Sequence, residues 1–191
     1  MKASVVILAA GEGTRMSSGL PKAMQFLAGQ TMLEHIKHTA DSLSSEQTII
    51  VCSPGAEKQM VKTLGKPDQG LAYVQQTEHL GTGHALMCSL SKINQDNVVL
   101  VLLGDVPLVS PKTIVKLVNS AATNTLTLLT ANIDDPKGYG RIIRNANNEI
   151  IAILEDEECT TKQKTINEIN SGIMAFPPNR LSRWLNRLSA N

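Results

Sequence analysis

A glycine-rich segment near the start of the chain combines small residues with two cations. It reads Leu8-Ala9-Ala10-Gly11-Glu12-Gly13-Thr14-Arg15-Met16, and Leu20-Pro21-Lys22 follows shortly after it. Small residues and glycines let backbone N–H groups come close to an anion, and Arg15 and Lys22 add positive charge beside them. This combination suits the binding of a triphosphate.

Two common phosphate-binding loops do not match this segment. A dinucleotide fingerprint needs a third glycine where Met16 stands, and an acidic residue near the end of the second strand, where the chain has Cys52 and Ser53. A P-loop needs Gly-Lys followed by Ser or Thr, whereas Lys22 follows a proline and precedes Ala23. The dinucleotide interpretation is therefore weak, and the P-loop interpretation fails.

A single aspartate follows the most apolar run of the chain. Residues 97–103 read as a strand, Gly104-Asp105 ends it, and Val106-Pro107 prevents a regular continuation. A carboxylate at this edge of a sheet can hold magnesium against triphosphate oxygens, because magnesium prefers a few hard oxygens together with substrate phosphates. The alternative role for Asp105 is to cap a turn.

Apolar runs alternate with helix signals along the first two thirds of the chain. Strands are expected at residues 5–8, 48–52, 72–75 and 97–103. Helices are expected after the capping box Thr31-Met32-Leu33-Glu34 and after Pro54, Gly81 and Ser110. The alternation predicts an α/β fold with a mostly parallel sheet flanked by helices. The glycine-rich loop and Asp105 then lie at the carboxyl ends of strands, where such sheets bind ligands.

The pattern changes after residue 131. Asp134-Asp135-Pro136 breaks the alternation, and residues 141–144 and 149–154 read as a β-hairpin joined at Asn147-Asn148. A strand near residues 169–176 and a final amphipathic helix with Leu181, Trp184, Leu185 and Leu188 complete the chain. We therefore expect an antiparallel excursion from the parallel sheet.

Length, composition and charge limit the domain number and the classes of partner that this chain can have. The chain has 191 residues, which suits one domain, and it is 42% apolar and 18% charged with a formal net charge of +1. This balance gives no basic field for nucleic acid or a membrane surface. The cysteines are scattered and odd in number, and His35 and His38 have no third ligand nearby, so neither a disulfide framework nor a zinc site is expected. A reducing cytoplasm is the expected location, and self-association is left open.

Five sequence blocks carry a family resemblance. The loop is similar to the nucleotide-binding loop of sugar-phosphate nucleotidyltransferases, and it recurs here with QQTEHLGTGHA, LGDVPL, DPKGYGRI and EINSGI at residues 75–85, 103–108, 135–142 and 168–173. Together, in this order, the blocks resemble the uridylyltransferase domains of bacterial bifunctional N-acetylglucosamine-1-phosphate uridylyltransferase/glucosamine-1-phosphate acetyltransferases. The resemblance runs from Ser4 to about Leu188, which is nearly the whole chain.

The resemblance implies a Rossmann-like nucleotidyltransferase fold and a reaction. A phosphate oxygen of N-acetylglucosamine 1-phosphate would attack the α-phosphorus of UTP in line, giving UDP-N-acetylglucosamine and pyrophosphate, with Mg²⁺ as cofactor and no covalent enzyme intermediate. Such catalysis rests on positioning and charge neutralisation. The resemblance places Arg15 towards the leaving phosphates, Lys22 near the attacked phosphate and Asp105 on the metal.

The resemblance also implies binding residues for each substrate. For the nucleotide the matching residues are Leu8, Ala9, Ala10, Gly11, Lys22, Gln76, Gly81, Thr82, Leu103 and Gly104. The amide of Gln76 suits uracil but can rotate to suit cytosine, so a cytidylyltransferase stays open, as does a guanylyltransferase. For the sugar phosphate the matching residues are Gly140, Glu155 and Asn170, although Glu155 begins an acidic run that is also typical of a solvated surface.

Two departures from the family pattern limit what it implies. Chains of this family continue beyond position 191, with an asparagine that supplies a second protein ligand to magnesium and a left-handed β-helix that carries the acetyltransferase. We therefore expect an incomplete nucleotidyltransferase domain and no acetyl transfer, and a nucleotide-binding fragment without turnover is the alternative of another class. Glu12 stands where the family often has a basic or neutral residue, so its charge must point away from a triphosphate.

Overall fold

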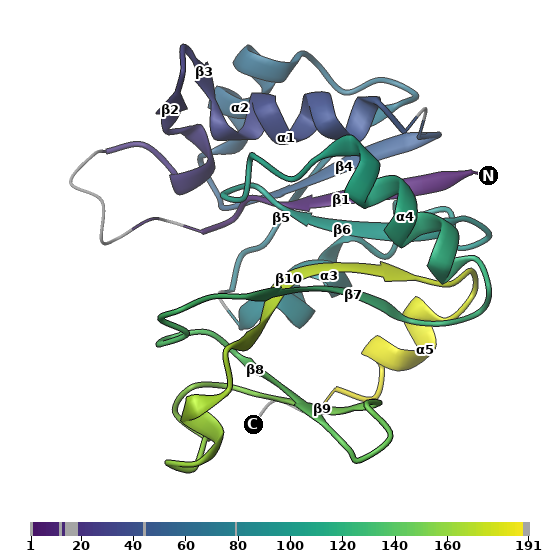
Figure 1. Cartoon of the computed structure of the whole chain (residues 1–191). Helices are drawn as coiled ribbons and strands as arrows, with labels where there is room; N and C mark the ends of the chain where they lie inside the picture. The colour runs from purple at the N-terminus through teal and green to yellow at the C-terminus, as the bar shows by residue number, and fades with distance from the viewer. Residues whose placement is uncertain (1, 12, 14–18, 44, 79, 189–191) are drawn as a thin grey trace. The chain divides into compact units, whose positions relative to one another are not determined.

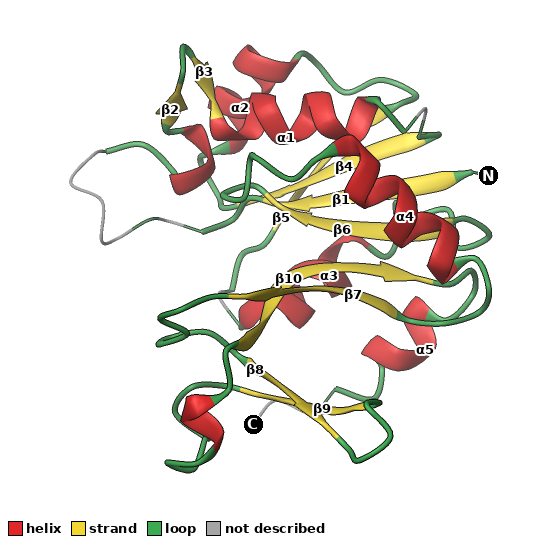
Figure 2. Cartoon of the chain, in the orientation of Figure 1, coloured by secondary structure: helices red, strands yellow, loops and turns green. Residues whose placement is uncertain are grey.

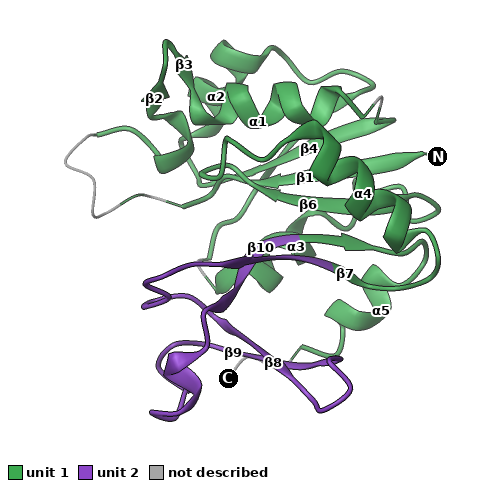
Figure 3. Cartoon of the chain, in the orientation of Figure 1, with its two compact units in different colours: residues 1–127, 174–191 green, residues 128–173 purple. Residues whose placement is uncertain are grey.

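The computed structural model describes residues 2–11, 13, 19–43, 45–78 and 80–188 (Figure 1). Arg15 and Glu12 lie outside these residues. The chain divides into two compact units, residues 1–127 with 174–191 and residues 128–173 (Figure 3). Each unit is described by itself below, and the expectation of a single domain stays a prediction.

A parallel sheet forms the centre of the first unit. Its strands, in spatial order, are β5 (Leu71–Gln75), β4 (Gln47–Cys52), β1 (Ala3–Leu8) and β6 (Val98–Leu103). The last residues of β10 (Glu168–Phe176) pair with β6 in the antiparallel direction. Leu8 lies opposite Val51 and Leu103, so β1, β4 and β6 end at the same edge. The prediction of an α/β, Rossmann-like fold with a mostly parallel sheet is confirmed.

A helix follows each of the four parallel strands as the sequence signals predict, and a fifth helix follows β10 (Figure 2). They are α1 (Met32–Asp41), α2 (Glu57–Leu64), α3 (Gly81–Ser89), α4 (Pro111–Ala121) and α5 (Leu181–Leu185). The capping box before α1 is formed in both directions, between Thr31 and Glu34. Ser110 caps α4, where proline takes the first helical position. Among the described residues no helix has the length and apolar character needed to cross a membrane.

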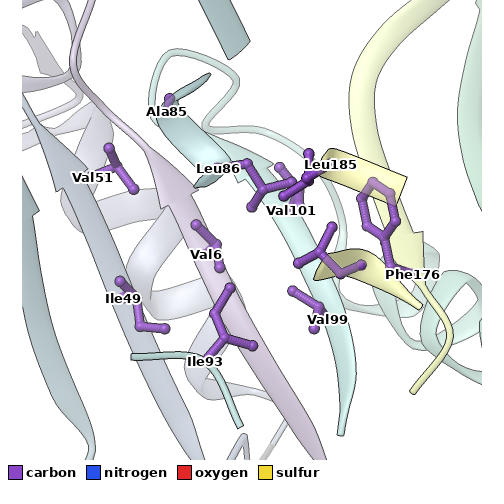
Figure 4. Close-up of a cluster of buried hydrophobic side chains, with 11 residues drawn as sticks. Val6, Ile49, Val51, Ala85, Leu86, Ile93, Val99, Val101, Phe176 and Leu185 are labelled. Carbon is purple, nitrogen blue, oxygen red and sulfur yellow. The ribbon is translucent and has the colours of Figure 1, made fainter. Parts of the chain in front are cut away.

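The core on one face of this sheet is a continuous apolar cluster (Figure 4). Val6, Ile49 and Val51 from the strands meet Ala85 and Leu86 of α3 there, with Phe176, Leu181 and Leu185 beyond them. Alternate strand residues point to opposite faces, so Ile7, Ile50 and Leu102, all fully buried, belong to the other face. Burial on both faces explains why these strands read as unbroken apolar runs.

The last helix is shorter than the sequence pattern indicates. α5 ends at Leu185, and the N–H of Leu188 donates to the carbonyl of Leu185 in a tighter, non-helical turn. The side chain of Leu188 lies against Gly83, because a Cβ on Gly83 would lie 2.8 Å from Cδ1 of Leu188. The predicted apolar residues are present, but Leu188 lies beyond the end of α5.

The segment between the glycine-rich loop and α1 contains elements that sequence patterns did not indicate. A 3-10 turn η1 (Lys22–Met24) leads into the two-stranded hairpin of β2 (Phe26–Leu27) and β3 (Gln30–Thr31). Its turn uses positive φ angles at Ala28 and Gly29, which lets two very short strands pair. The Nε2 of His35 in α1 lies 2.8 Å from the carbonyl oxygen of Leu27, so this histidine contacts the hairpin.

The second unit contains antiparallel strands. They are β7 (Thr127–Asn132), β8 (Arg141–Arg144), β9 (Ile150–Leu154) and the first part of β10, and η2 (Gln163–Thr165) precedes β10. β8 and β9 form the predicted hairpin, with Asn148 at a φ of 64°, a conformation that asparagine tolerates better than most residues. β10 pairs with both β7 and β8.

Candidate active site

The order of the parallel strands creates a gap between two loops at one sheet edge. From β1 the chain proceeds outwards to β4 and then β5, and it returns through α3 to β6 on the other side of β1. The loops after β1 and β6 therefore leave the sheet in different directions. Open α/β sheets bind their ligands at such a position. The glycine-rich loop and Asp105 both start there.

The glycine-rich loop returns to its own start at Lys22. The backbone N–H of Ala9 donates to the carbonyl of Val51 across 2.7 Å, and the N–H of Lys22 donates to the carbonyl of Gly11 across 3.3 Å. Gly13 has a φ of +63°, and a Cβ there would lie 3.1 Å from the Cβ of Lys22. Glycine is therefore needed at this position for Lys22 to come so close.

The first of two neighbouring pockets lies between this loop and the start of α3. It has a volume of about 270 Å³, near the lower end for small-molecule sites. Its lining is Leu8, Ala10, Gly11, Gln76, Gly81, Thr82 and Ala85. Gln76 is held in place because its N–H continues the β5–β4 pairing to Cys52, and its side chain is almost fully buried. Six of the predicted nucleotide-binding residues thus surround one pocket.

The second pocket is smaller and carries the charged groups. It has a volume of about 80 Å³ and is lined by Leu8, Ala9, Gly11, Lys22, Ala23 and Asp105. The Nζ of Lys22 lies 2.5 Å from Oδ2 of Asp105, and the two side chains are 46% and 30% exposed. An ion pair this exposed adds little to stability. Leu8 and Gly11 line both pockets, so the two pockets adjoin. The first is lined mainly by small and apolar residues, and the second contains Lys22 and Asp105.

The structure shows a packing role for Gly104. Its N–H donates to the carbonyl of Leu8 across 2.9 Å, and a Cβ on it would lie 2.9 Å from the Cβ of Ala23 and 3.1 Å from that of Ala9. Neither Gly104 nor Leu103 lines either pocket. Gly104 therefore lets β6 approach the two segments that form the charged pocket.

We predict that Gly104→Ala lowers the free energy of unfolding by about 1–3 kcal/mol, the usual cost of inserting a methyl group into a well-packed site. The strain falls on Ala9 and Ala23, so nucleotide affinity should fall as well. Gly19→Ala is the matched control, because no described residue other than its chain neighbours has an atom within 4 Å of its Cβ position. Denaturant unfolding of both variants checks this. Equal losses in the two variants would contradict it.

The three predicted sugar-phosphate residues lie together in the second unit. The N–H of Asn170 donates to the carbonyl of Gly140 across 2.8 Å. A Cβ on Gly140 would lie 3.3 Å from Oε1 of Glu155, so a side chain there would crowd the carboxylate. The Oδ1 of Asn170 accepts from the N–H of Gly172, which fixes the orientation of its amide.

A partly buried ion pair supports this group, and sequence reasoning missed it. Arg141 is 1% exposed; its Nη2 lies 2.8 Å from Oδ1 of Asp156 and its Nη1 donates to the carbonyl of Tyr139, whereas its Nε has no partner among the described residues. Loss of hydration raises the pKa of Asp156, but hydrogen bonds from Gly138 and Arg141 outweigh it and hold the pKa below its ordinary value. Asp156 belongs to the acidic run that sequence patterns read as solvated surface, so no signal separated it from its neighbours.

Other residues of the site also gave no sequence signal. Ala23 and Ala85 line the pockets, but alanine carries no reactive group. Arg15 was expected to face the leaving phosphates, and it lies outside the described residues. Within the described part of the chain, no group of three or more His, Cys, Asp or Glu side chains is placed to hold a metal ion.

Comparison with known proteins identifies the family of this chain. Residues 5–159 match the MobA-like NTP transferase domain. Three similar proteins are each named bifunctional protein GlmU: those of Stutzerimonas stutzeri (43% identical over 189 residues), Hydrogenovibrio crunogenus (43% over 190) and Pseudomonas entomophila (44% over 191). The alignments cover 99%, 99% and 100% of this chain but 41% of each relative, so the chain spans about two fifths of their length. The resemblance inferred from the five sequence blocks is confirmed, and the chain belongs to the MobA-like NTP transferase family.

Proposed function

We propose that this chain transfers a uridylyl group from UTP to N-acetylglucosamine 1-phosphate, forming UDP-N-acetylglucosamine and releasing pyrophosphate. Family membership supports nucleotidyl transfer itself. The observation that carries the proposal is the pair of adjoining pockets, one lined by Gln76 and the start of α3, the other by Lys22 and Asp105. In a nucleoside triphosphate a ribose joins the base to the phosphates, so its site needs a pocket for the base next to a pocket with charged groups.

The first pocket is suited to a pyrimidine base. Leu8, Ala10 and Ala85 offer apolar surface, while Gln76 and the backbone at Gly81 offer polar groups at its edge. Gly81 has a φ of +87°, and its carbonyl accepts from the Gln76 side chain. Since a small-molecule site combines apolar walls with a few fixed polar groups, these residues can hold the base and set its orientation.

The second pocket is suited to the phosphates. In the proposed reaction a phosphate oxygen of the sugar phosphate attacks the α-phosphorus of UTP, and the bond to the β-phosphate breaks. The sugar phosphate and the triphosphate are both negatively charged and repel each other. The ammonium of Lys22 lowers the barrier by neutralising charge at the attacked phosphate. The backbone N–H groups of the loop contribute in the same way.

Asp105 fits the role of magnesium ligand. Its carboxylate is partly exposed, it lines the charged pocket, and it lies at the end of β6. Magnesium takes one or two carboxylates together with substrate phosphates and water. Bound there, the ion would supply charge stabilisation and orientation of the phosphates. Lys22 and the ion bound at Asp105 would then both bring positive charge to the phosphates.

The second unit supplies the residues proposed for the sugar. Gly140 allows close approach, the Glu155 carboxylate can accept from hydroxyl groups, and the amide of Asn170 can donate through its Nδ2 while its Oδ1 is held by Gly172. The partly buried pair of Arg141 and Asp156 supports the same segment.

An assay of pyrophosphate release tests the proposal. UTP with N-acetylglucosamine 1-phosphate should release pyrophosphate in a magnesium-dependent way, and CTP, GTP or glucose 1-phosphate should react more slowly. Release with a different pair of substrates would assign another nucleotidyltransferase reaction. Calorimetric binding of UTP without release under any of these conditions would favour a nucleotide-binding role instead.

A further inference from the structure

The side-chain amide of Gln76 is held in one orientation by two contacts of its NH₂ group. Its Nε2 lies 3.1 Å from the carbonyl oxygen of Gly81 and 3.3 Å from Nδ1 of His84. A carbonyl oxygen only accepts hydrogen bonds, so the contact with Gly81 alone requires that the NH₂ group faces this side. The rotation that sequence reasoning left open at Gln76 is therefore restricted.

The orientation leaves the carbonyl oxygen of the amide for the ligand. No described residue donates a hydrogen bond to Oε1 of Gln76. Gln76 lines the first pocket, and its Oε1 is on the opposite side of the amide from the NH₂ group. Gln76 therefore presents an acceptor to whatever occupies that pocket.

His84 completes the restraint without lining the pocket itself. Both protons of the Gln76 NH₂ group point at acceptors only if Nδ1 of His84 is unprotonated. The ring is then neutral, with its proton on Nε2. That nitrogen lies 3.9 Å from Sγ of Cys88, one helical turn further along α3, and sulfur is a weak acceptor. A row of side chains thus runs from Cys88 through His84 to Gln76.

We propose that His84 is a positioning residue that sets the base selectivity of this site. It accepts from Gln76 and keeps Oε1 towards the pocket, where the oxygen pairs with the N3–H donor of uracil. Cytosine has an acceptor at N3, which would face Oε1 without a proton between the two atoms. A site built around one hydrogen bond rejects an analogue that cannot make it. This inference rests on the proposed uridylyl transfer.

The test compares UTP with CTP in the wild type and in two variants at the same position. His84→Leu keeps an apolar volume and removes the acceptor. The ratio of UTP affinity to CTP affinity should fall about three- to tenfold, the scale of one neutral hydrogen bond. His84→Asn returns an acceptor oxygen at a distance from the backbone similar to that of Nδ1, so it should restore most of the ratio. Calorimetry with each nucleotide gives both affinities.

Two controls separate positioning from general damage. His38→Leu removes an exposed histidine from α1 and should leave the ratio unchanged. Nitrogen NMR of the imidazoles in the free wild-type protein should show His84 with its proton on Nε2, and this readout needs no variant to fold. A proton on Nδ1 would overturn the inference.

The outcomes also separate this inference from the proposed function. Wild-type protein that prefers UTP, with an unchanged ratio in His84→Leu or no recovery in His84→Asn, would overturn the role of His84 and leave uridylyl transfer standing. Wild-type protein that does not prefer UTP over CTP would overturn both.

Discussion

Replacing Lys22 by alanine is expected to lower turnover by about two to three orders of magnitude, the scale for losing one preorganised charge contact in an active site. Lys22 lines the charged pocket, and η1 and the contact with Gly13 fix its backbone. The side chain is 46% exposed, so its loss should not unfold the protein. Steady-state pyrophosphate release at saturating UTP, together with thermal unfolding, measures both expectations.

The chain contains a matched control for this variant. Lys37 and Asp41 form another lysine–aspartate pair on α1, and neither residue lines either pocket. The Nζ of Lys37 lies 2.5 Å from Oδ1 of Asp41, the same distance as in the pair of Lys22 and Asp105. Lys37→Ala should therefore retain full turnover. If Lys22→Ala also keeps most of its turnover, Lys22 has no place in the reaction. If the two variants lose turnover equally, the loss does not come from the pocket.

The sequence was sufficient for the elements that carry local signals. The capping box at Thr31 and Glu34, the serine cap and proline before α4, and the Asn-Asn turn of the β8–β9 hairpin are all formed as predicted. Their information lies within a few residues, where turn chemistry and apolar period decide the conformation. The mostly parallel sheet could also be predicted, because parallel strands that are buried on both faces read as continuous apolar runs.

Features that depend on contacts between distant residues could not be predicted in this way. Arg141 reads as an ordinary strand residue until Asp156 is placed beside it. The close approach of Gly104 to Ala23 joins positions far apart in the chain, and no periodicity encodes it. The contact between Gln76 and His84 depends on how the end of β5 meets the start of α3. Sequence reasoning therefore left the Gln76 amide free to rotate, and the structure restrains it.

Replacing Asp105 by asparagine is expected to raise the magnesium concentration at half-maximal activity by about tenfold to a hundredfold, a scale seen even when groups that only support metal ligands are removed. Asparagine has nearly the same shape, so the turn after β6 can remain, but its neutral oxygen lacks the ionic attraction that magnesium prefers. The same substitution removes a negative charge from beside the triphosphate. UTP binding without metal should therefore stay the same or improve, because the substitution removes the repulsion between the Asp105 carboxylate and the triphosphate.

Opposite changes in these two measurements would distinguish a metal ligand from a structural residue. Magnesium titrations of activity give the half-saturation, and calorimetry with UTP in the presence of a chelator gives the metal-free affinity. Asp41→Asn is the control, since it breaks the corresponding pair on α1 and should leave both quantities unchanged. Loss of metal-free UTP binding in Asp105→Asn would point to a distorted loop. An unchanged half-saturation would assign Asp105 to the turn after β6, and magnesium would then have to bind through ligands other than this carboxylate.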